Sequence, residues 1–430
     1  MSRLFFVIIS FIILSGCSKN TNFKDLNKSE STKDNSLEKL FEKKQIFSQE
    51  FNPDLELDLT KNNIKNKITD IKNDYGFQDY KGAFNKVENY KFLKFNTNKE
   101  LNYKPLFLSN GIIFFNKKGT IIKYDDNGKV VWKKNFYSKS EKKLQPKLNF
   151  ANQNEFLIVA DNIAKLYSIN INTGEIAWSK SNTYSYNSEI KVNKNKLFVV
   201  DYKNTLRCYR INDGVECWNL QTEDSFTISN TKFSLVIINN LVVFSNSIGD
   251  ITAADIDSGL IRWQLPTQKS SIINESYNFK NSKLVSDGKS IFFSNNKNQF
   301  FSIDVKTGTI NWINKINSHM MPILNGDLIF TISNEGFLFV IEKLNGNIIR
   351  INDLYKQYKI KERKKIFPTG FAIGSSKLYM SNNNGRMVVA NMINGDILKI
   401  EKIAGNFISK PFIFKNSLFI IKNGSIVKYD

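Results

Sequence analysis

Histidine and cysteine are scarce in this sequence, which has one histidine, His319, and three cysteines in 430 residues. Catalytic relays and zinc or copper centres built on several imidazoles need more than one histidine, so the sequence excludes both. Catalysis through His319 alone is not excluded, but no other motif supports it. The hydrophobic share of 41% and the aromatic share of 13% exclude a wholly disordered chain, because they allow a large buried core.

Arginine is scarce as well. The formal net charge is +21, yet only seven of the 61 Lys and Arg residues are arginine. Proteins that read bases favour arginine, whose planar side chain bonds two acceptors at once. An excess of lysine beside abundant Asn and Ile is instead typical of an AT-rich genome. We therefore expect no nucleic-acid partner.

The N-terminus has a short basic start and an apolar run from Leu4 to Leu14 that only Ser10 interrupts. The run is too short for a membrane-spanning helix, which needs about 20 residues, but it suits the apolar region of a signal peptide. Leu14-Ser-Gly-Cys17 ends the run and resembles the lipobox of bacterial lipoproteins, in which the cysteine is acylated. We therefore expect a lipoprotein signal peptide at 1–16 and acyl chains on Cys17 that anchor the protein in the membrane. The alternative is an ordinary signal followed by a chance cysteine.

The residues after this cysteine predict a location and a tether. In the lipoproteins that this N-terminus resembles, Asp in the next position favours the inner membrane, so Ser18 predicts the periplasmic face of the cell outer membrane. Between Ser18 and Leu37 there are few apolar residues, and Lys, Asn, Asp, Ser and Glu are abundant up to about residue 90. We expect the lipidated cysteine and a flexible polar tether at 17–90. A docking segment is the alternative to a plain spacer.

The rest of the sequence, 91–430, repeats a turn glycine that is followed four residues later by a tryptophan. Successive glycines are 38 to 49 residues apart. Two further copies, at Gly346 and Gly395, have Arg350 and Lys399 in place of the tryptophan. All five tryptophans of the chain belong to the repeat, in the pairs Gly128 and Trp132, Gly174 and Trp178, Gly214 and Trp218, Gly259 and Trp263, and Gly308 and Trp312.

Each copy has the pattern of four short strands. Apolar residues alternate on both sides of the turns, and Gly, Asn, Asp and Ser supply the turn geometry. Four strands in about 45 residues are typical of a propeller blade. We predict an all-β, eight-bladed β-propeller with four antiparallel strands per blade, or alternatively seven blades. Each tryptophan then fills the wedge between neighbouring blades, with ligand stacking as the alternative.

The ends of the chain are expected to close the ring. The eighth copy begins at Leu418 and stops after its third strand, and its end, Ser-Ile-Val-Lys-Tyr-Asp430, is similar to Thr-Ile-Ile-Lys-Tyr-Asp125 of the first copy. We expect residues 90–95 to add the missing fourth strand. An N-terminal strand then completes the last blade.

Two copies carry a family resemblance. Ala-Ala-Asp255-Ile-Asp-Ser-Gly259-Leu-Ile-Arg-Trp263 and Ser-Ile-Asp304-Val-Lys-Thr-Gly308-Thr-Ile-Asn-Trp312 resemble the quinoprotein-type (PQQ-like) propeller repeat. With a lipobox and eight blades, the chain resembles the BamB family, lipoprotein subunits of the outer-membrane β-barrel assembly machine. The resemblance implies a non-enzymatic scaffold without a cofactor. It also implies as partners a BamA-like barrel protein, other lipoproteins of the complex and nascent outer-membrane proteins.

The resemblance also implies contact residues. The family's loops that contact BamA carry a Leu-x-Leu-Arg stretch, where this chain has Phe226-Thr-Ile228-Ser229, and a second, Asp-rich loop falls near Asn281. The apolar pair matches and the charged residues do not. The alternative is that Phe226 and Ile228 begin a strand and face the core. Independently of the resemblance, we expect the long segments between copies to lie at one end of the ring. Insertions gathered at one end of a repeat array mark the binding face. These segments are 137–150, 181–190, 221–230, 266–283 and 351–370.

Two other classes remain as alternatives. Quinoprotein dehydrogenases resemble the repeat, but they hold their cofactor with adjacent cysteines, a calcium site and a catalytic Asp, and this chain has no adjacent cysteines. Asp255 and Asp304 occupy equivalent turn positions in separate copies, which fits turn stabilisation better than one converging site. We therefore predict no catalytic residues and no metal site. A propeller that binds glycan or peptide without an assembly role is the third class.

Cys208 and Cys217 flank one repeat turn, six residues before and three residues after Gly214. A tight turn would place them opposite each other, and the periplasm is oxidising. The spacing predicts either a cross-strand disulfide or two thiols on one face.

Overall fold

The computed structural model describes residues 49–59, 76, 80–92, 103–223, 232–267, 280–374 and 376–430. The chain divides into two compact units, Met1–Gln45 and Ile46–Asp430, and every described residue belongs to the second. The expected signal peptide and Cys17 lie outside the described residues. Within the described ranges, no helix combines the length and apolar character needed to cross a membrane.

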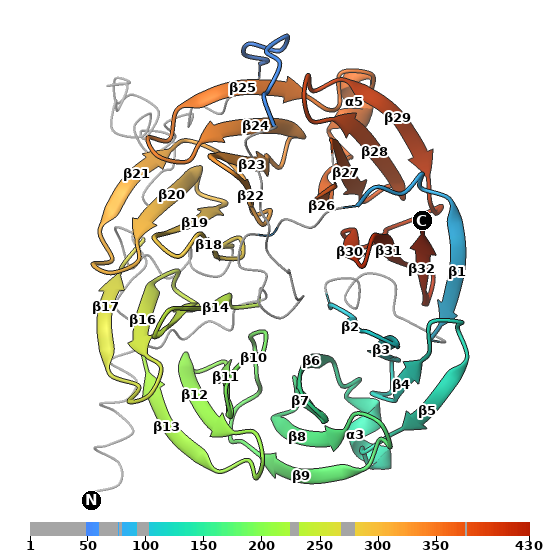
Figure 1. Ribbon diagram of the computed structural model, residues 1–430, viewed down its shortest axis with the longest axis vertical. Helices are drawn as coiled ribbons and strands as arrows, with labels where there is room; N and C mark the ends of the chain where they lie inside the picture. Colours follow the sequence, from blue (N-terminus) through green and yellow to red (C-terminus); the bar gives the residue numbers. More distant parts are fainter. Residues whose placement is uncertain are drawn as a thin grey trace, which may run out of the picture. The chain divides into compact units, whose positions relative to one another are not determined.

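The second unit is a ring of eight four-stranded antiparallel sheets, seen face-on in Figure 1. In blades 1 to 7, four consecutive strands form a meander, and we call them A, B, C and D from the centre outward. The prediction of an eight-bladed, all-β propeller is therefore confirmed, and the seven-bladed alternative is wrong.

The first four blades follow one another along the chain. Blade 1 contains β2 (Leu106–Leu108), β3 (Gly111–Phe115), β4 (Ile121–Tyr124) and β5 (Val130–Lys134). Blade 2 contains β6 (Leu148–Gln153), β7 (Phe156–Asp161), β8 (Lys165–Asn170) and β9 (Ile176–Ser181). Blade 3 contains β10 (Lys191–Asn193), β11 (Lys196–Val200), β12 (Thr205–Arg210) and β13 (Glu216–Gln221). Blade 4 contains β14 (Leu235–Ile238), β15 (Leu241–Ser245), β16 (Ile251–Asp255) and β17 (Ile261–Leu265).

The other four blades complete the ring. Blade 5 contains β18 (Val285–Ser286), β19 (Ser290–Asn295), β20 (Gln299–Asp304) and β21 (Ile310–Asn314). Blade 6 contains β22 (Ile323–Asn325), β23 (Leu328–Ile332), β24 (Phe337–Glu342) and β25 (Ile348–Asp353). Blade 7 contains β26 (Pro368–Gly374), β27 (Lys377–Asn382), β28 (Arg386–Asn391) and β29 (Ile397–Lys402). Blade 8 contains β30 (Phe412–Phe414), β31 (Ser417–Lys422), β32 (Ser425–Tyr429) and β1 (Lys86–Lys91). The short helices α3 (Lys139–Lys143) and α5 (Ile360–Arg363) follow blades 1 and 6.

The N-terminal strand β1 closes the ring as expected. It pairs antiparallel with β32, with Tyr90 opposite Ile426. The strand lies at 86–91 rather than at 90–95, because its pairing with β32 already begins at Lys86 opposite Tyr429. The buried ring of Phe92, just after the strand, packs edge-on against Phe114. Chain closure through one shared blade is thus confirmed, with the strand shifted toward the N-terminus.

The repeat glycines and tryptophans meet across the boundaries between blades. A Cβ added at Gly308 would lie 2.6 Å from the ring of Trp263 in the preceding blade, so only glycine fits against the indole. Gly308 also has a φ of +73°, which favours glycine for a second reason. The Trp263 Nε1–H donates to the carbonyl of Val305 at 2.8 Å. All five tryptophans pack in this way from strand D of one blade onto the turn glycine of the next, the packing that the spacing predicts. The Nε1–H bond to a carbonyl of that turn is made by four of them and not by Trp218.

The two copies without tryptophan face N-terminal segments of the chain. Arg350 takes the tryptophan position of blade 6, is fully buried, and donates from Nη2 to the carbonyl of Met392 at 2.7 Å. That carbonyl lies three residues before Gly395, as Val305 lies three before its turn glycine. In blade 7, the Lys399 amine lies over the ring of Phe84, just before β1.

Residues 49–59 lie against blades 6 and 7. Phe51 forms an antiparallel bridge with Ile351 on the free edge of β25, with N–H···O distances of 3.1 and 2.8 Å. Leu57 donates its backbone N–H to the carbonyl of Ile393 at 2.9 Å, and its side chain is buried. This segment therefore packs on the propeller as an ordered part of it.

These contacts fall within the expected tether at 17–90, which stays a prediction for 17–48, 60–75 and 77–79, outside the described residues. The compact unit begins at Ile46, and residues 49–59 and 80–92 pack against the blades. Sequence pattern missed this because the few apolar residues of the segment contact partners almost 300 positions away, as in the hydrogen bond between Arg350 and the Leu55 carbonyl.

Candidate partner interface

The connections between blades lie at the same end of the ring as the B–C turns. In blade 2, Asn182 after strand D donates its backbone N–H to Ala164 of the B–C turn at 2.8 Å. In blade 3, Thr222 bonds Asn204 in the same way at 3.2 Å. The long D-to-A connections thus gather at one end, as predicted, and in the structure they span 135–147, 182–190, 222–234, 266–284 and 354–367.

The connections after blades 3 and 4 carry the predicted partner residues. Phe226, Ile228 and Ser229 lie outside the described residues, so their positions stay predictions. Asn281 is described and is half-buried at the end of the second connection. Its side-chain Nδ2 lies 3.5 Å from the carbonyl of Gly249, in the B–C turn of blade 4. The structure therefore puts one of the four residues at the base of a loop rather than at its tip.

A polar cluster fixes the start of the first connection. The Asn204 Nδ2 donates to the carbonyl of Glu223 and to Ser247 Oγ, both at 2.8 Å. In return, Asn204 Oδ1 accepts the backbone N–H of Ser247 at 3.0 Å. Because Asn204 belongs to blade 3 and Ser247 to blade 4, one buried amide ties the loop base to the B–C turns of two blades.

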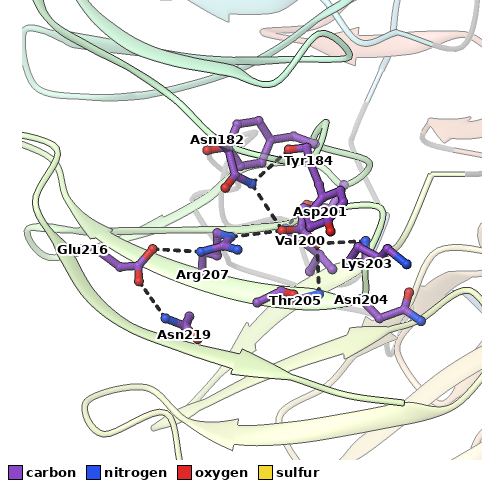
Figure 2. Close-up of polar contacts among 12 residues, drawn as sticks. Asn182, Tyr184, Val200, Asp201, Lys203, Asn204, Thr205, Arg207, Glu216 and Asn219 are labelled. Carbon is purple, nitrogen blue, oxygen red and sulfur yellow. Dashed lines mark hydrogen bonds and ion pairs between the residues drawn. The ribbon is translucent and has the colours of Figure 1, made fainter. Parts of the chain in front are cut away.

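A second network holds the turn on which Asn204 stands, as Figure 2 shows. The buried Asp201 accepts backbone N–H bonds from Lys203 at 2.9 Å and Thr205 at 3.2 Å through Oδ1. Its Oδ2 accepts from Arg207 Nε at 3.0 Å, and Arg207 Nη1 reaches Glu216 at 3.1 Å. The carboxylate therefore has hydrogen-bond partners on both oxygens, and the turn is rigid.

Both ends of the second connection meet one carbonyl. Thr267 Oγ1 donates to Gly249 O at 2.8 Å, and the Nδ2 of Asn281 approaches the same atom. Burial and, after it, the neighbouring carboxylate of Glu223 raise the pKa of Asp250, the next residue. The two loop bases thus meet at one B–C turn, where Glu223 of the first base lies near Asp250 of the turn. This geometry can present two loops to a partner from a rigid base.

Sequence reasoning missed the role of Asn204. Its backbone has a φ of +58°, and its side chain bonds across blades. The available signal was the Asp201-Tyr-Lys-Asn204 turn between two apolar strands, in which an Asn is favoured at positive φ. Nothing in one sequence predicts that the amide reaches the neighbouring blade.

The candidate catalytic carboxylates serve turns. Asp255 Oδ1 accepts hydrogen bonds from the backbone N–H groups of Asp257 and Ser258. The hydrogen bond from Arg262 has the largest effect on the pKa of Asp255, and together with these backbone bonds it holds that pKa well below its usual range. Asp304 accepts the equivalent pair of N–H groups in blade 5. Both fit the expected turn role. Among the described residues, no group of three or more His, Cys, Asp or Glu side chains could hold a metal ion.

The cysteines are not opposite each other. Cys208 pairs with Trp218 across β12 and β13, and a bulge follows before Tyr209 pairs with Glu216. Cys217 is the extra residue of this bulge. The expectation of a tight turn assumed regular pairing without a bulge. Both are free thiols, with Cys208 buried and Cys217 exposed. Burial, and then a hydrogen bond with Cys217, raises the pKa of Cys208.

We expect the two thiols to react very differently. In a Cys17→Ser variant under native conditions, iodoacetamide should modify the exposed Cys217 at least about 100-fold faster than the buried, high-pKa Cys208. After unfolding without a reductant, mass spectrometry should find both residues labelled. An unlabelled pair in the unfolded protein would reveal a disulfide, and Cys217→Ser should leave only the slow site.

Comparisons with known proteins agree with this architecture. The family model described as outer membrane protein assembly factor BamB matches residues 117–352. No curated protein matches the chain in sequence. The crystal structure of BamB from Moraxella catarrhalis is similar, with a TM-score of 0.63 and 14% identity over 81% of this chain and 98% of that one.

Two further solved structures are similar. A quinohemoprotein alcohol dehydrogenase from Pseudomonas putida has a TM-score of 0.62 and 11% identity over 83% of this chain and 78% of that one. The computationally designed Ika8 protein has a TM-score of 0.58 and 12% identity over 79% of this chain and 99% of that one. At these identities the likeness extends to the fold alone.

Proposed function

The chain belongs to the BamB family of outer membrane protein assembly factors, and we propose that it is a non-enzymatic scaffold lipoprotein at the periplasmic face of the outer membrane. In this role it is anchored by acyl chains on Cys17 and binds a BamA-like barrel protein. Other lipoproteins of the assembly complex and nascent outer-membrane proteins are its further proposed partners. No cofactor takes part.

The convergence of two loop bases on one turn is the observation that carries this proposal. The first loop starts from the Asn204 cluster, and both ends of the second meet Gly249. Rigid bases with long loops at one end of a propeller suit recognition of another macromolecule. The apolar pair Phe226 and Ile228, on the first loop, is the proposed contact with the partner.

The alternative of a dehydrogenase has less support. The similarity to a quinohemoprotein alcohol dehydrogenase is one of fold at 11% identity. The carboxylates of Asp255 and Asp304 accept hydrogen bonds from backbone N–H groups of their own turns. Their placement in separate blades favours a structural role over a shared catalytic centre. A propeller that binds glycan or peptide stays the second alternative.

Capture from solubilised outer membranes, followed by mass spectrometry, tests the proposal. The wild-type chain should retain a β-barrel protein of the BamA type. A Phe226→Asp, Ile228→Asp double variant should lower the retained amount about 10-fold or more, because charge enters an apolar contact. Its thermal transition should match the wild type.

Exposed leucines at the opposite end provide a matched control. Leu260 and Leu344 lie in C–D turns with 67% and 91% of their surface exposed. Leu260→Asp with Leu344→Asp should leave capture unchanged. Equal loss in this control, or early unfolding of the Phe226 and Ile228 variant, would contradict the assigned contact. Capture without any barrel protein would contradict the assembly role.

A further inference from the structure

The connection between blades 6 and 7 carries a concentration of positive charge. Six of the twelve residues at 356–367 are Lys or Arg, against 61 of 430 in the whole chain, and only Glu362 is acidic. A lysine-rich composition alone therefore does not account for this segment. It includes the helix α5, and its six cations are Lys356, Lys359, Lys361, Arg363, Lys364 and Lys365.

Two of the six cations have acidic partners. Arg363 Nη2 lies 2.9 Å from the carboxylate of Asp353, and its guanidinium lies over the ring of Phe337. Arg363 thereby fixes the helix to blade 6. Lys356 Nζ lies 4.0 Å from Glu50. In the described ranges, no ion pair or hydrogen bond involves the amines of the other four, which are the exposed residues Lys359, Lys361, Lys364 and Lys365.

Blade 7 holds the end of this connection and extends its charge. Asn383, in the B–C turn, donates from Nδ2 to the carbonyl of Lys365 at 2.9 Å, and its Oδ1 accepts the backbone N–H of Phe367 at 3.0 Å. The backbone N–H of Asn383 also donates to the carbonyl of Phe367 at 3.1 Å. Arg386 and Lys402 are opposite each other at the adjoining ends of β28 and β29, and both are exposed. The lysines of the connection thus stand on a fixed base beside two further cations.

Apolar side chains are exposed among these cations. Ile360 begins α5 and has 76% of its surface exposed, and Phe367 has 44% exposed. The ring of Phe407, from the connection between blades 7 and 8, packs against Phe367 with 5.6 Å between the ring centroids. Singly exposed apolar residues are common on proteins. Apolar side chains beside unpaired lysines, however, are typical of surfaces that bind at the interface of a lipid bilayer.

The connection between blades 1 and 2 repeats this arrangement. Leu144 follows α3 and has 63% of its surface exposed. The acid of the helix, Glu141, pairs with Lys165 at 2.7 Å and accepts the backbone N–H of Ser138. In the described part of the chain, the helix lysines without an ion pair are Lys139, Lys142 and Lys143. Both helices lie in D-to-A connections, hence at the same end of the ring, and both lie in the right half of Figure 1, so one flat surface can meet them together.

We propose that this end of the ring docks on an anionic phospholipid surface. Ile360 and Leu144 enter the headgroup region, and the unpaired lysines face the phosphate groups. Flexible lysine side chains suit a fluid surface, whereas the fixed carboxylates of a protein partner are matched better by arginine. Two separate connections at one end also fit a plane better than they fit one acidic peptide. The choice of lipid rests on the proposed acyl anchor on Cys17, which keeps the chain at a membrane.

Photocrosslinking to vesicles tests the docked orientation. In three variants of the full chain, p-benzoylphenylalanine replaces Ile360, Leu144 or Leu344, the last of which is exposed in a C–D turn at the opposite end. Vesicles of phosphatidylglycerol and phosphatidylcholine in equal parts should give lipid adducts at 360 and 144 in at least about 10-fold higher yield than at 344. Pure phosphatidylcholine should show no such preference, because the charge attraction is absent. Vesicle binding by the apolar N-terminus is common to the three variants and does not favour one position.

Charge reversal tests the lysines. Lys361→Glu with Lys365→Glu should lower the adduct yield at position 360 at least about 10-fold, because two cations that face the phosphates become anions. The matched control, Lys129→Glu with Lys306→Glu, reverses two exposed lysines in C–D turns at the opposite end and should leave the yield unchanged. Both variants should unfold at the wild-type temperature, since all four lysines are exposed.

Three results would overturn the docking surface. They are equal adduct yields at 360 and 344, equal loss of yield in the control variant, and adducts at 360 with protein rather than lipid in isolated outer membranes. Normal capture of a barrel protein beside any of these results would leave the proposed assembly role intact. Lipid adducts at 360 and 144 without capture of a barrel protein would support the docking surface and contradict the assembly role.

Discussion

Replacement of Trp263 by alanine is expected to lower the free energy of unfolding by about 3–5 kcal/mol, the usual range for loss of a large buried ring. Trp263 has only 8% of its surface exposed and connects blades 4 and 5. The substitution removes the bond from Nε1 to the Val305 carbonyl and leaves a cavity against Gly308. Denaturant unfolding measures the loss.

A double-mutant cycle attributes the effect to the contact between Trp263 and Gly308. Gly308→Ala alone should destabilise the protein strongly, because the new Cβ would lie 2.6 Å from the indole ring. In the Trp263→Ala background the clash is gone, and only the cost of positive φ, about 1 kcal/mol, remains. The double variant should therefore be more stable than the sum of the single effects implies.

Gly288 offers the matched control for this cycle. It also has a positive φ, +89°, but a Cβ there would meet nothing within 4 Å. Gly288→Ala should lower the free energy of unfolding only by the cost of a positive φ, and by the same amount in the wild type and in Trp263→Ala. Additive effects of Trp263→Ala and Gly308→Ala would contradict the packing that we assign to this pair.

The repeat made the fold predictable because it reports local chemistry. A glycine at positive φ and a tryptophan four residues later each act within one C–D hairpin and its neighbour, so the same short pattern recurs in five copies. The hairpin also contains a bulge, after Ser168, Cys208 and Ala253 and at the matching place in other blades. Alternation alone does not reveal a bulge, which is why the opposition of Cys208 and Cys217 was wrong.

Contacts between distant segments were not predictable from the pattern. Lys283 pairs with Glu189 from another blade, and in a chain with 61 Lys and Arg residues no single lysine is conspicuous. The loop residues Phe226 and Ile228 came from a family resemblance, and they stay a prediction. The one anomaly that carried a long-range signal was Arg350, an arginine in a position where five copies have tryptophan.

Arg350 holds residues 49–59 on the propeller. Its Nη1 donates to the carbonyls of Leu55, at 2.8 Å, and Ile393, while its Nη2 keeps the bond to Met392. A tryptophan has one N–H donor and could serve only one of these carbonyls. Burial lowers the pKa of Arg350 to about 10, so the guanidinium stays charged at neutral pH. The substitution thus exchanges a packing residue for a clamp.

Replacement of Arg350 by alanine is expected to lower the free energy of unfolding by at least about 3 kcal/mol, because the buried carbonyl of Met392 and the partly buried carbonyls of Leu55 and Ile393 lose a charged donor. Hydrogen exchange should also accelerate at the backbone N–H groups of Phe51 and Leu57, which bond to blades 6 and 7. The control Arg363→Ala, which removes a partly exposed pair with Asp353, should cost less than about 1 kcal/mol and leave both amides protected. Unchanged exchange at Phe51 and Leu57 in Arg350→Ala would mean that the edge bridge and the buried leucine hold the segment without the clamp.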